Sequence, residues 1–203
     1  EGGRLFYLGA GTSGRLAVAD AAECPPTFGA DPSMVTGIIA GGQKRVFSAS
    51  ENEEDLDDKG KLDIAEAGCT KGDVVVGVSV AGGAAYVVGA LETAKALGAS
   101  TIALTCNYDT PIGAVSDLCI ITDTGAEVIT GSTRLKAGSA HKMILNMIST
   151  AVMVKLGHVY ENMMINLRPS NIKLRDRMIR IVVEITGTDY ADAERLLEEN
   201  GFV

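Results

Sequence analysis

Short apolar runs that alternate with longer helical patterns constrain the fold of this chain more than any other feature. The apolar runs are rich in Val, Ile and Leu and span Leu5–Leu8, Met34–Ala40, Val74–Val80, Thr101–Thr105 and Leu118–Ile121. Helical patterns lie between or after them, near Gly14–Ala22, Glu51–Ala67, Ala84–Leu97 and Ser139–Leu156. Strands with so little polar alternation are typical of a sheet that helices cover on both faces. The pattern therefore predicts an α/β fold with a doubly wound, five-stranded parallel sheet and right-handed crossovers.

The strand pattern stops near Arg168-Pro169-Ser170. Beyond this point Ile172–Ile185 and Tyr190–Glu199 predict two amphipathic helices, and Asn200-Gly201 is a typical helix end. We expect a sheet domain over residues 1–168 and a helical tail over residues 169–203, the start of a small second module. The chain begins without a methionine, which indicates a fragment.

Charge and composition disfavour several classes of partner. The net charge is −8 and the cationic side chains form no cluster on a helix, so neither nucleic acid nor an anionic membrane surface is an expected partner. Residues 74–91 carry no charge and are long enough for a membrane span, but their glycines divide them into a strand, a turn and a helix. Four widely spaced cysteines and only two histidines predict a reduced, cytoplasmic protein without a metal site.

A glycine-rich turn follows the first predicted strand. Gly9, Gly11 and Gly14 complete the spacing G-x-G-x-x-G, which is associated with dinucleotide binding. A dinucleotide site also needs an acidic residue after the second strand, and the sequence there is Ala-Gly-Gly-Gln. The backbone N–H groups at the start of a helix, together with the hydroxyls of Thr12 and Ser13, suit a different phosphate. A tight turn with no ligand remains the alternative.

Two further loops are candidates for the same site. Residues 79–85 after the third strand are glycine-rich and open a helix, which fits an ordinary turn or an anion site. Residues 125–139 gather hydroxyls, two cations and a carboxylate ahead of an apolar helix. They fit either a helix start capped by the hydroxyl of Ser139 or Thr133, with the cations solvated, or a polar wall that contacts sugar hydroxyls and phosphate.

Three segments together resemble one family. They read GAGTSGRLAVADAAECPPTFG, ENEEDLDDKG and GAEVITGSTRLKAGSAHKMILNMIST, and the chain is similar to the N-acetylmuramic acid 6-phosphate etherases over nearly its whole length. These enzymes belong to the sugar isomerase (SIS) domain superfamily, as does the glucokinase regulatory protein. The resemblance implies a SIS-type five-stranded sheet with a helical tail, and a homodimer whose site takes residues from both subunits. It also implies a chain truncated at both ends, in a protein that uses no cofactor or metal.

The implied reaction removes D-lactate from carbon 3 of a phosphorylated amino sugar and then adds water, giving N-acetylglucosamine 6-phosphate. A base must take the proton at carbon 2 and an acid must protonate the departing oxygen, tasks that suit buried carboxyls with raised pKa values. By resemblance, Glu23 in the Glu-Cys-Pro-Pro-Thr segment is the acid, expected just after the first helix, and Glu54 is the candidate base. Without the resemblance, Glu54 would be one member of a solvated acidic run.

The residues expected to bind the sugar phosphate come from the three polar loops. They are Gly11, Thr12, Ser13, Gly14, Gly82, Glu127, Ser132, Thr133 and Lys136. Glu127 is also a candidate base, because related isomerases use a glutamate in the equivalent loop. The etherases usually carry Ser-Gly-Arg-Thr-Pro in the second loop, whereas residues 81–85 here are Ala-Gly-Gly-Ala-Ala. This departure keeps two alternatives open: a noncatalytic sugar-phosphate sensor, and a sugar-phosphate isomerase.

Overall fold

The structure is a computed structural model that describes residues 2–49, 52–167, 169 and 171–201. It divides into two compact units. The sheet unit comprises Glu1–Ala22 and Ser33–Ile148, and the helical unit comprises Glu23–Pro32 and Ser149–Val203. The domain boundary expected after residue 168 falls on a residue outside the described part of the chain and stays a prediction.

The sheet unit contains the predicted five-stranded parallel sheet. Its strands are β1 (Leu5–Gly9), β2 (Val35–Ile39), β3 (Val74–Val78), β4 (Ser100–Thr105) and β5 (Leu118–Ile121). They lie in the order β2-β1-β3-β4-β5, and every neighbouring pair is parallel. Gly9 at the end of β1 is in register with Ile39 and Val78, so β1, β2 and β3 end at one level. The sheet confirms the fold predicted from the alternating apolar runs.

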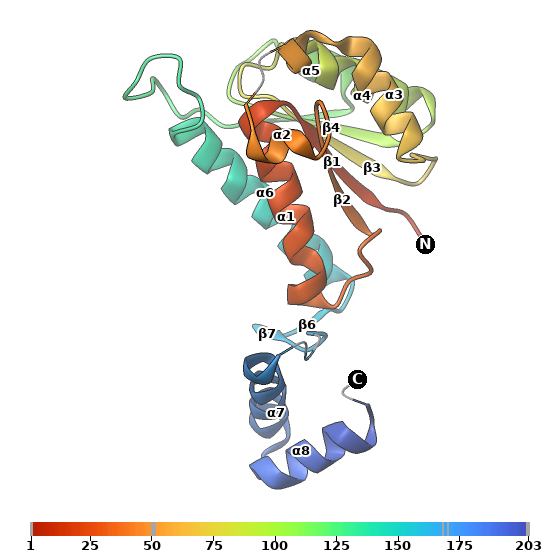
Figure 1. Cartoon of the computed structure of the whole chain (residues 1–203), viewed down its shortest axis with the longest axis vertical. Helices are drawn as coiled ribbons and strands as arrows, with labels where there is room; N and C mark the ends of the chain where they lie inside the picture. Colours follow the sequence, from red (N-terminus) through yellow and green to blue (C-terminus); the bar gives the residue numbers. More distant parts are fainter. Residues whose placement is uncertain (1, 50–51, 168, 170, 202–203) are drawn as a thin grey trace. The chain divides into compact units, whose positions relative to one another are not determined.

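Helices cover both faces of this sheet (Figure 1). In chain order they are α1 (Gly11–Phe28), α2 (Lys44–Phe47), the 3-10 helix η1 (Asn52–Asp55), α3 (Asp57–Glu66), α4 (Ala85–Ala96), α5 (Pro111–Val115) and α6 (Lys136–Lys155). Phe6 and Leu8 of β1 pack with side chains of α3, α4 and α5 in one buried cluster. Tyr7 points to the opposite face, where its hydroxyl donates a hydrogen bond to the carbonyl of Leu145 in α6. Alternate residues of the central strand are thus buried on opposite faces.

Two glycines allow α3 and α4 to lie against each other. A methyl group on Gly60 would stand 1.9 Å from the carbonyl oxygen of Tyr86, and one on Gly89 would stand 2.5 Å from the carbonyl oxygen of Asp57. Both obstacles are backbone atoms, so a change of side-chain rotamer cannot relieve them. The close contact between these helices therefore requires glycine at both positions.

We expect Gly60→Ala to lower the free energy of unfolding by about 1 to 3 kcal/mol, the range found when a packed interior is overfilled. Urea unfolding followed by circular dichroism measures the change. Gly83→Ala is the matched control, because a methyl group there would meet no atom within 4 Å. An unchanged midpoint for Gly60→Ala would show that the two helices can separate without loss.

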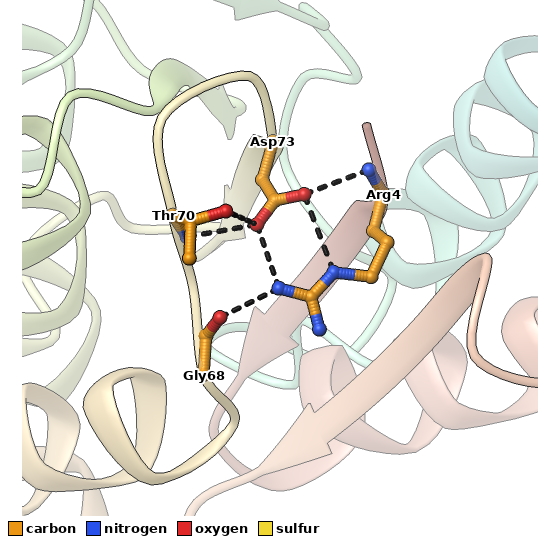
Figure 2. Close-up of polar contacts among 4 residues, drawn as sticks. All are labelled: Arg4, Gly68, Thr70 and Asp73. Atoms are coloured by element: carbon orange, nitrogen blue, oxygen red, sulfur yellow. Dashed lines mark hydrogen bonds and ion pairs between the residues drawn. The ribbon is translucent and has the colours of Figure 1, made fainter. Parts of the chain in front are cut away.

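An ion pair fixes the starts of β1 and β3 (Figure 2). The guanidinium of Arg4 donates to both carboxylate oxygens of Asp73, at 3.3 and 2.8 Å, and to the carbonyl of Gly68 at 2.6 Å. The backbone N–H of Arg4 and the N–H and hydroxyl of Thr70 also donate to this carboxylate. The Asp73 side chain is only 2% exposed. Burial alone would raise the pKa of Asp73, but the bonds from Arg4 and Thr70 outweigh it and lower the pKa to about 2.

The helical unit contains the end of α1, a short antiparallel pair of strands and two helices. Strands β6 (Val159–Tyr160) and β7 (Met163–Met164) pair with each other, and α7 (Ile172–Thr186) and α8 (Tyr190–Glu199) follow. Leu167, Met178, Ile179, Ala193 and Leu197 form its buried core. Both C-terminal helices match the predicted positions, whereas the strand pair was not predicted. In the part of the chain that the structure describes, every helix is too short or too polar to span a lipid bilayer.

Candidate active site

A cleft of about 310 Å³ lies at the carboxyl ends of β1 and β3. Residues 10–13 line it from the turn after β1, and residues 78–81 with Ala84 line it from the loop after β3. Glu54 of η1 and three residues near the start of α6 complete it. The carboxyl edge is where ligands of doubly wound sheets bind, because the connecting loops gather there. Of the residues expected to form the site, the cleft brings together Gly11, Thr12, Ser13, Glu54 and Thr133.

The first turn presents the start of α1 to the cleft. The helix begins at Gly11, which has a positive φ of 54°, and Thr12 and Ser13 follow as half-buried hydroxyl residues. The N–H groups in the first turn of a helix have no partner within the helix and carry the positive end of its dipole. Gly14 is needed for the close packing of α1 on β1, because a methyl group there would stand 2.4 Å from the Gly9 carbonyl oxygen.

The second loop leads from β3 into α4. Ser79 is 8% exposed, lines the cleft and accepts a hydrogen bond at 3.1 Å from the N–H of Gly82 through its hydroxyl oxygen. Gly82 has a φ of +78°, and a methyl group on it would stand 2.4 Å from Cβ of Thr110. Gly82 therefore allows the loop to pack against Thr110, and it does not line the cleft. Helix α4 starts beyond Ala84, whose side chain provides no cap.

The segment before α6 supplies Gly131, Thr133 and Gly138 to the lining, but Ser132 and Lys136 lie outside it. Glu127 caps α6, because its carboxylate accepts hydrogen bonds of 2.9 Å from the N–H groups of Lys136 and Ala137. These bonds, first that from Ala137, lower the pKa of Glu127. Its carboxylate is thus occupied as a helix cap, which differs from the hydroxyl cap by Ser139 or Thr133 considered from the sequence.

Glu54 differs from Glu53 and Asp57. Glu53 forms a 3.0 Å ion pair with Arg45, and Asp57 forms one of 2.7 Å with Lys61. The ion pairs seen among the described residues do not include Glu54. Its side chain is exposed and lines the cleft, where it is the only charged one among the described lining residues. The carboxylate selected by resemblance alone is therefore the one that the fold brings to the cleft.

Glu23 lies inside α1, which differs from the expected position just after the first helix. The helix continues through Pro25 and Pro26 to Phe28, although each proline removes one backbone hydrogen bond. Two contacts stabilise the end of the helix. The Gly29 N–H donates to the carbonyl of Pro25, and Nδ1 of His158 lies 2.7 Å from the carbonyl oxygen of Phe28. Glu23 belongs to the helical unit, is exposed and is not among the lining residues of the cleft. Glu23 and Glu54 are thus both exposed, whereas buried carboxyls were expected.

The structure also shows features that the sequence did not reveal. Ser79, Gly131 and Gly138 line the cleft; all three lie in the candidate loops at residues 79–85 and 125–139, but none was among the individual residues expected to bind the sugar phosphate. His141 is fully buried in α6, with its Nε2 3.4 Å from Sγ of Cys106. Burial lowers the pKa of His141 to about 4 against a smaller opposing effect of the Thr105 backbone, so the ring is neutral at pH 7. No group of three or more His, Cys, Asp or Glu residues in the described ranges could hold a metal ion.

Comparison with solved structures supports the fold. A protein from E. coli CFT073 aligns with a TM-score of 0.56 at 18% identity, covering 78% of this chain and 73% of its own. A phosphoheptose isomerase from Francisella tularensis aligns with a TM-score of 0.54 at 16% identity, covering 75% and 78%. The family model of the glucokinase regulatory protein N-terminal SIS domain matches residues 1–95.

Comparison of sequences gives a closer relationship. An N-acetylmuramic acid 6-phosphate etherase from Symbiobacterium thermophilum is 53% identical over 98% of this chain and 66% of its own length. Etherases of the same name from Halalkalibacterium halodurans and Serratia proteamaculans are 52% and 51% identical over 100% and 99% of this chain, and 68% of each relative is covered. The chain thus spans about two thirds of the length of these relatives. Nearly all of its own residues are included in each match. It belongs to the N-acetylmuramic acid 6-phosphate etherase family.

Proposed function

We propose that this chain carries the substrate site of an N-acetylmuramic acid 6-phosphate etherase, a carbon–oxygen lyase that serves the recovery of cell-wall sugars in the cytoplasm. The reaction eliminates D-lactate from carbon 3 of the sugar and adds water in its place, giving N-acetylglucosamine 6-phosphate. The observation that carries the proposal is the position of Glu54. Among the members of the acidic run that the structure describes, it is the one that lines the cleft beside the first turn of α1.

The parts of the cleft suit the parts of the substrate. The start of α1, with Thr12 and Ser13, offers N–H and hydroxyl donors to the phosphate. Glu54 then serves as the base that removes the proton from carbon 2. Thr133 lies in the same lining and supplies a hydroxyl for the sugar.

We propose that Glu23 acts in the site of a second copy of the chain, as the acid that protonates the departing lactate oxygen. A site shared between subunits agrees with the exposure of Glu23. The sheet unit exposes large apolar side chains that a homodimer interface would cover. Met143 and Met147 of α6 are 64% and 62% exposed, and Val128 and Ile129 are 88% and 61% exposed.

A noncatalytic sugar-phosphate sensor is the second candidate. It is favoured by the lining itself, because the described lining residues include no lysine or arginine to neutralise a phosphate. A sensor, however, has no need of a carboxylate in the cleft, and Glu54 is present there. The isomerase alternative depends on Glu127 as the base, and that carboxylate is engaged by the N–H groups of α6.

Turnover in labelled water tests the proposal. The full-length protein is incubated with N-acetylmuramic acid 6-phosphate in ²H₂O containing H₂¹⁸O, and D-lactate release is followed with a coupled dehydrogenase. An etherase is expected to release lactate and to give a product with deuterium at carbon 2 and ¹⁸O at carbon 3. Saturable binding without lactate release would instead identify a sensor, and formation of a keto sugar would identify an isomerase.

A further inference from the structure

Three consecutive carbonyl groups of the second loop, at residues 80–82, bond to residues 105–112, which run from the end of β4 into α5. The carbonyl oxygen of Val80 accepts hydrogen bonds from the N–H of Cys106 and the hydroxyl of Thr105, both at 3.0 Å. The side-chain amide of Asn107 lies 3.4 Å from the same oxygen and 3.4 Å from the carbonyl oxygen of Ala81. The next carbonyl, that of Gly82, accepts a bond of 3.1 Å from the N–H of Ile112. Three consecutive carbonyls thus point toward one neighbouring segment.

This arrangement fixes the direction of the N–H groups in the loop. A trans peptide is planar, and its N–H points opposite to its C=O. The N–H groups of Ala81, Gly82 and Gly83 therefore point away from the β4–α5 connection. The N–H of Gly82 bonds to the Ser79 hydroxyl, whose residue lines the cleft, as does Ala81. Since the Ser79 hydroxyl already takes the N–H of Gly82, the N–H of Ala81, a residue of the cleft lining, is the one that this loop offers to an anion.

We propose that Asn107 is a positioning residue, which holds the second loop so that the N–H of Ala81 faces the anionic group of the ligand. The proposal rests on the proposed function only for the identity of the ligand, a sugar phosphate. Asn107 contacts the outer side of the loop and is not among the residues that line the cleft. It therefore acts through the loop and does not touch the ligand.

Asn107 suits this role better than the other donors. Thr105 is fully buried at the end of β4, and Cys106 contributes only its backbone N–H, so neither can be changed without disturbing the sheet. Asn107 is exposed, and its own N–H lies 3.3 Å from the Thr105 hydroxyl oxygen. Its amide is also the only side-chain group among the described residues that links the carbonyls of Val80 and Ala81. Loss of this amide frees the loop while the core stays intact.

The test compares Asn107→Leu, which keeps the approximate volume and loses the donor, with Asn107→Gln, which keeps a donor. Tyr108→Phe is the matched control, because Tyr108 is the next residue of the same connection and is 71% exposed. Binding of inorganic phosphate is measured by calorimetry, and kcat and KM are measured for the full-length protein. We expect Asn107→Leu to raise the phosphate Kd and the KM together by about threefold to tenfold, the effect of one neutral hydrogen-bonding group. The kcat should stay within about a factor of two, and the urea midpoint should stay within experimental error.

Three results decide the proposal. Recovery of phosphate affinity in Asn107→Gln supports it, since a merely structural role of the connection does not depend on a donor. An unchanged Kd in Asn107→Leu, or equal weakening in the Gln and Leu variants, overturns it. If Asn107→Leu fails to fold, Asn107→Ala takes its place under the same criteria. The phosphate measurement is independent of turnover, so a protein that binds phosphate with this pattern but releases no lactate would refute the etherase and leave the role of Asn107 standing.

Discussion

The Glu54→Gln variant is expected to release D-lactate at least a hundredfold more slowly than the unaltered protein. Removal of a positioned general base lowers the rate by about 10² to 10⁴, and an amide cannot accept the proton from carbon 2. Folding should be unaffected, because Glu54 is exposed and the ion pairs of the described residues do not involve it. The variant therefore separates chemistry from stability.

Substrate binding should change in the opposite direction to the rate. Glu54 is the only charged side chain among the described residues that line the cleft, and the substrate carries a phosphate and a carboxylate. Replacement by a neutral amide removes a repulsion, so the KM of Glu54→Gln should be equal to or lower than that of the unaltered protein. Steady-state kinetics of the full-length protein gives both constants.

Asp55→Asn is the matched control for this experiment. Asp55 is the next residue of the same 3-10 helix, is exposed and does not line the cleft. It loses the same charge from the same acidic run, and its kcat should stay within a factor of two. A rate for Glu54→Gln close to that of Asp55→Asn would remove Glu54 from the mechanism and would favour the sensor.

The sheet could be predicted from the sequence because burial on both faces leaves a clear pattern. Leu118–Ile121 has the predicted bounds, and Val35–Ile39 lies within one residue of its prediction at each end. Helix α1 was predicted to end too early, at Ala22. A proline pair usually ends a helix, and here contacts from Gly29 and His158 hold the last turn. The contact with His158 joins residues far apart in sequence and leaves no local signal.

The loops of the site could be predicted for the same reason, since the carboxyl ends of parallel strands share one edge. The choice among the carboxylates could not be predicted from the sequence. Glu53 and Glu54 are adjacent and chemically alike, and only the tertiary position of Arg45 shows that Glu53 is paired while Glu54 lines the cleft. The role of Glu127 is equally hidden, because a cap forms only once α6 has its observed start.

The second large effect is expected for Arg4→Met, which should lower the free energy of unfolding by about 3 kcal/mol at pH 7. The change leaves the Asp73 carboxylate, 2% exposed, without its cation, and breaking a buried ion pair in this way costs roughly 3 to 5 kcal/mol. The value lies at the lower end because the N–H groups of Arg4 and Thr70 still donate to the carboxylate. Urea unfolding followed by circular dichroism measures it. The exposed pair of Lys61 and Asp57 supplies the control, and Lys61→Met should change the midpoint little.

The dependence on pH identifies the cause of this loss. The ordinary pKa of 3.8 for Asp73 is lowered to about 2 in the folded protein, so its contribution to stability is complete above pH 4 and disappears as the pH falls toward 2. Protonated Asp73 needs no cation, and the difference in unfolding free energy between the unaltered protein and Arg4→Met should therefore narrow as the pH falls from 4 toward 2. The double variant Arg4→Met with Asp73→Asn should recover part of the loss at pH 7, since no buried charge remains. A difference that stays constant over this range, or a double variant less stable than Arg4→Met alone, would assign the loss to the packing of Arg4 on Phe6, whose ring centre lies 4.9 Å from the guanidinium carbon.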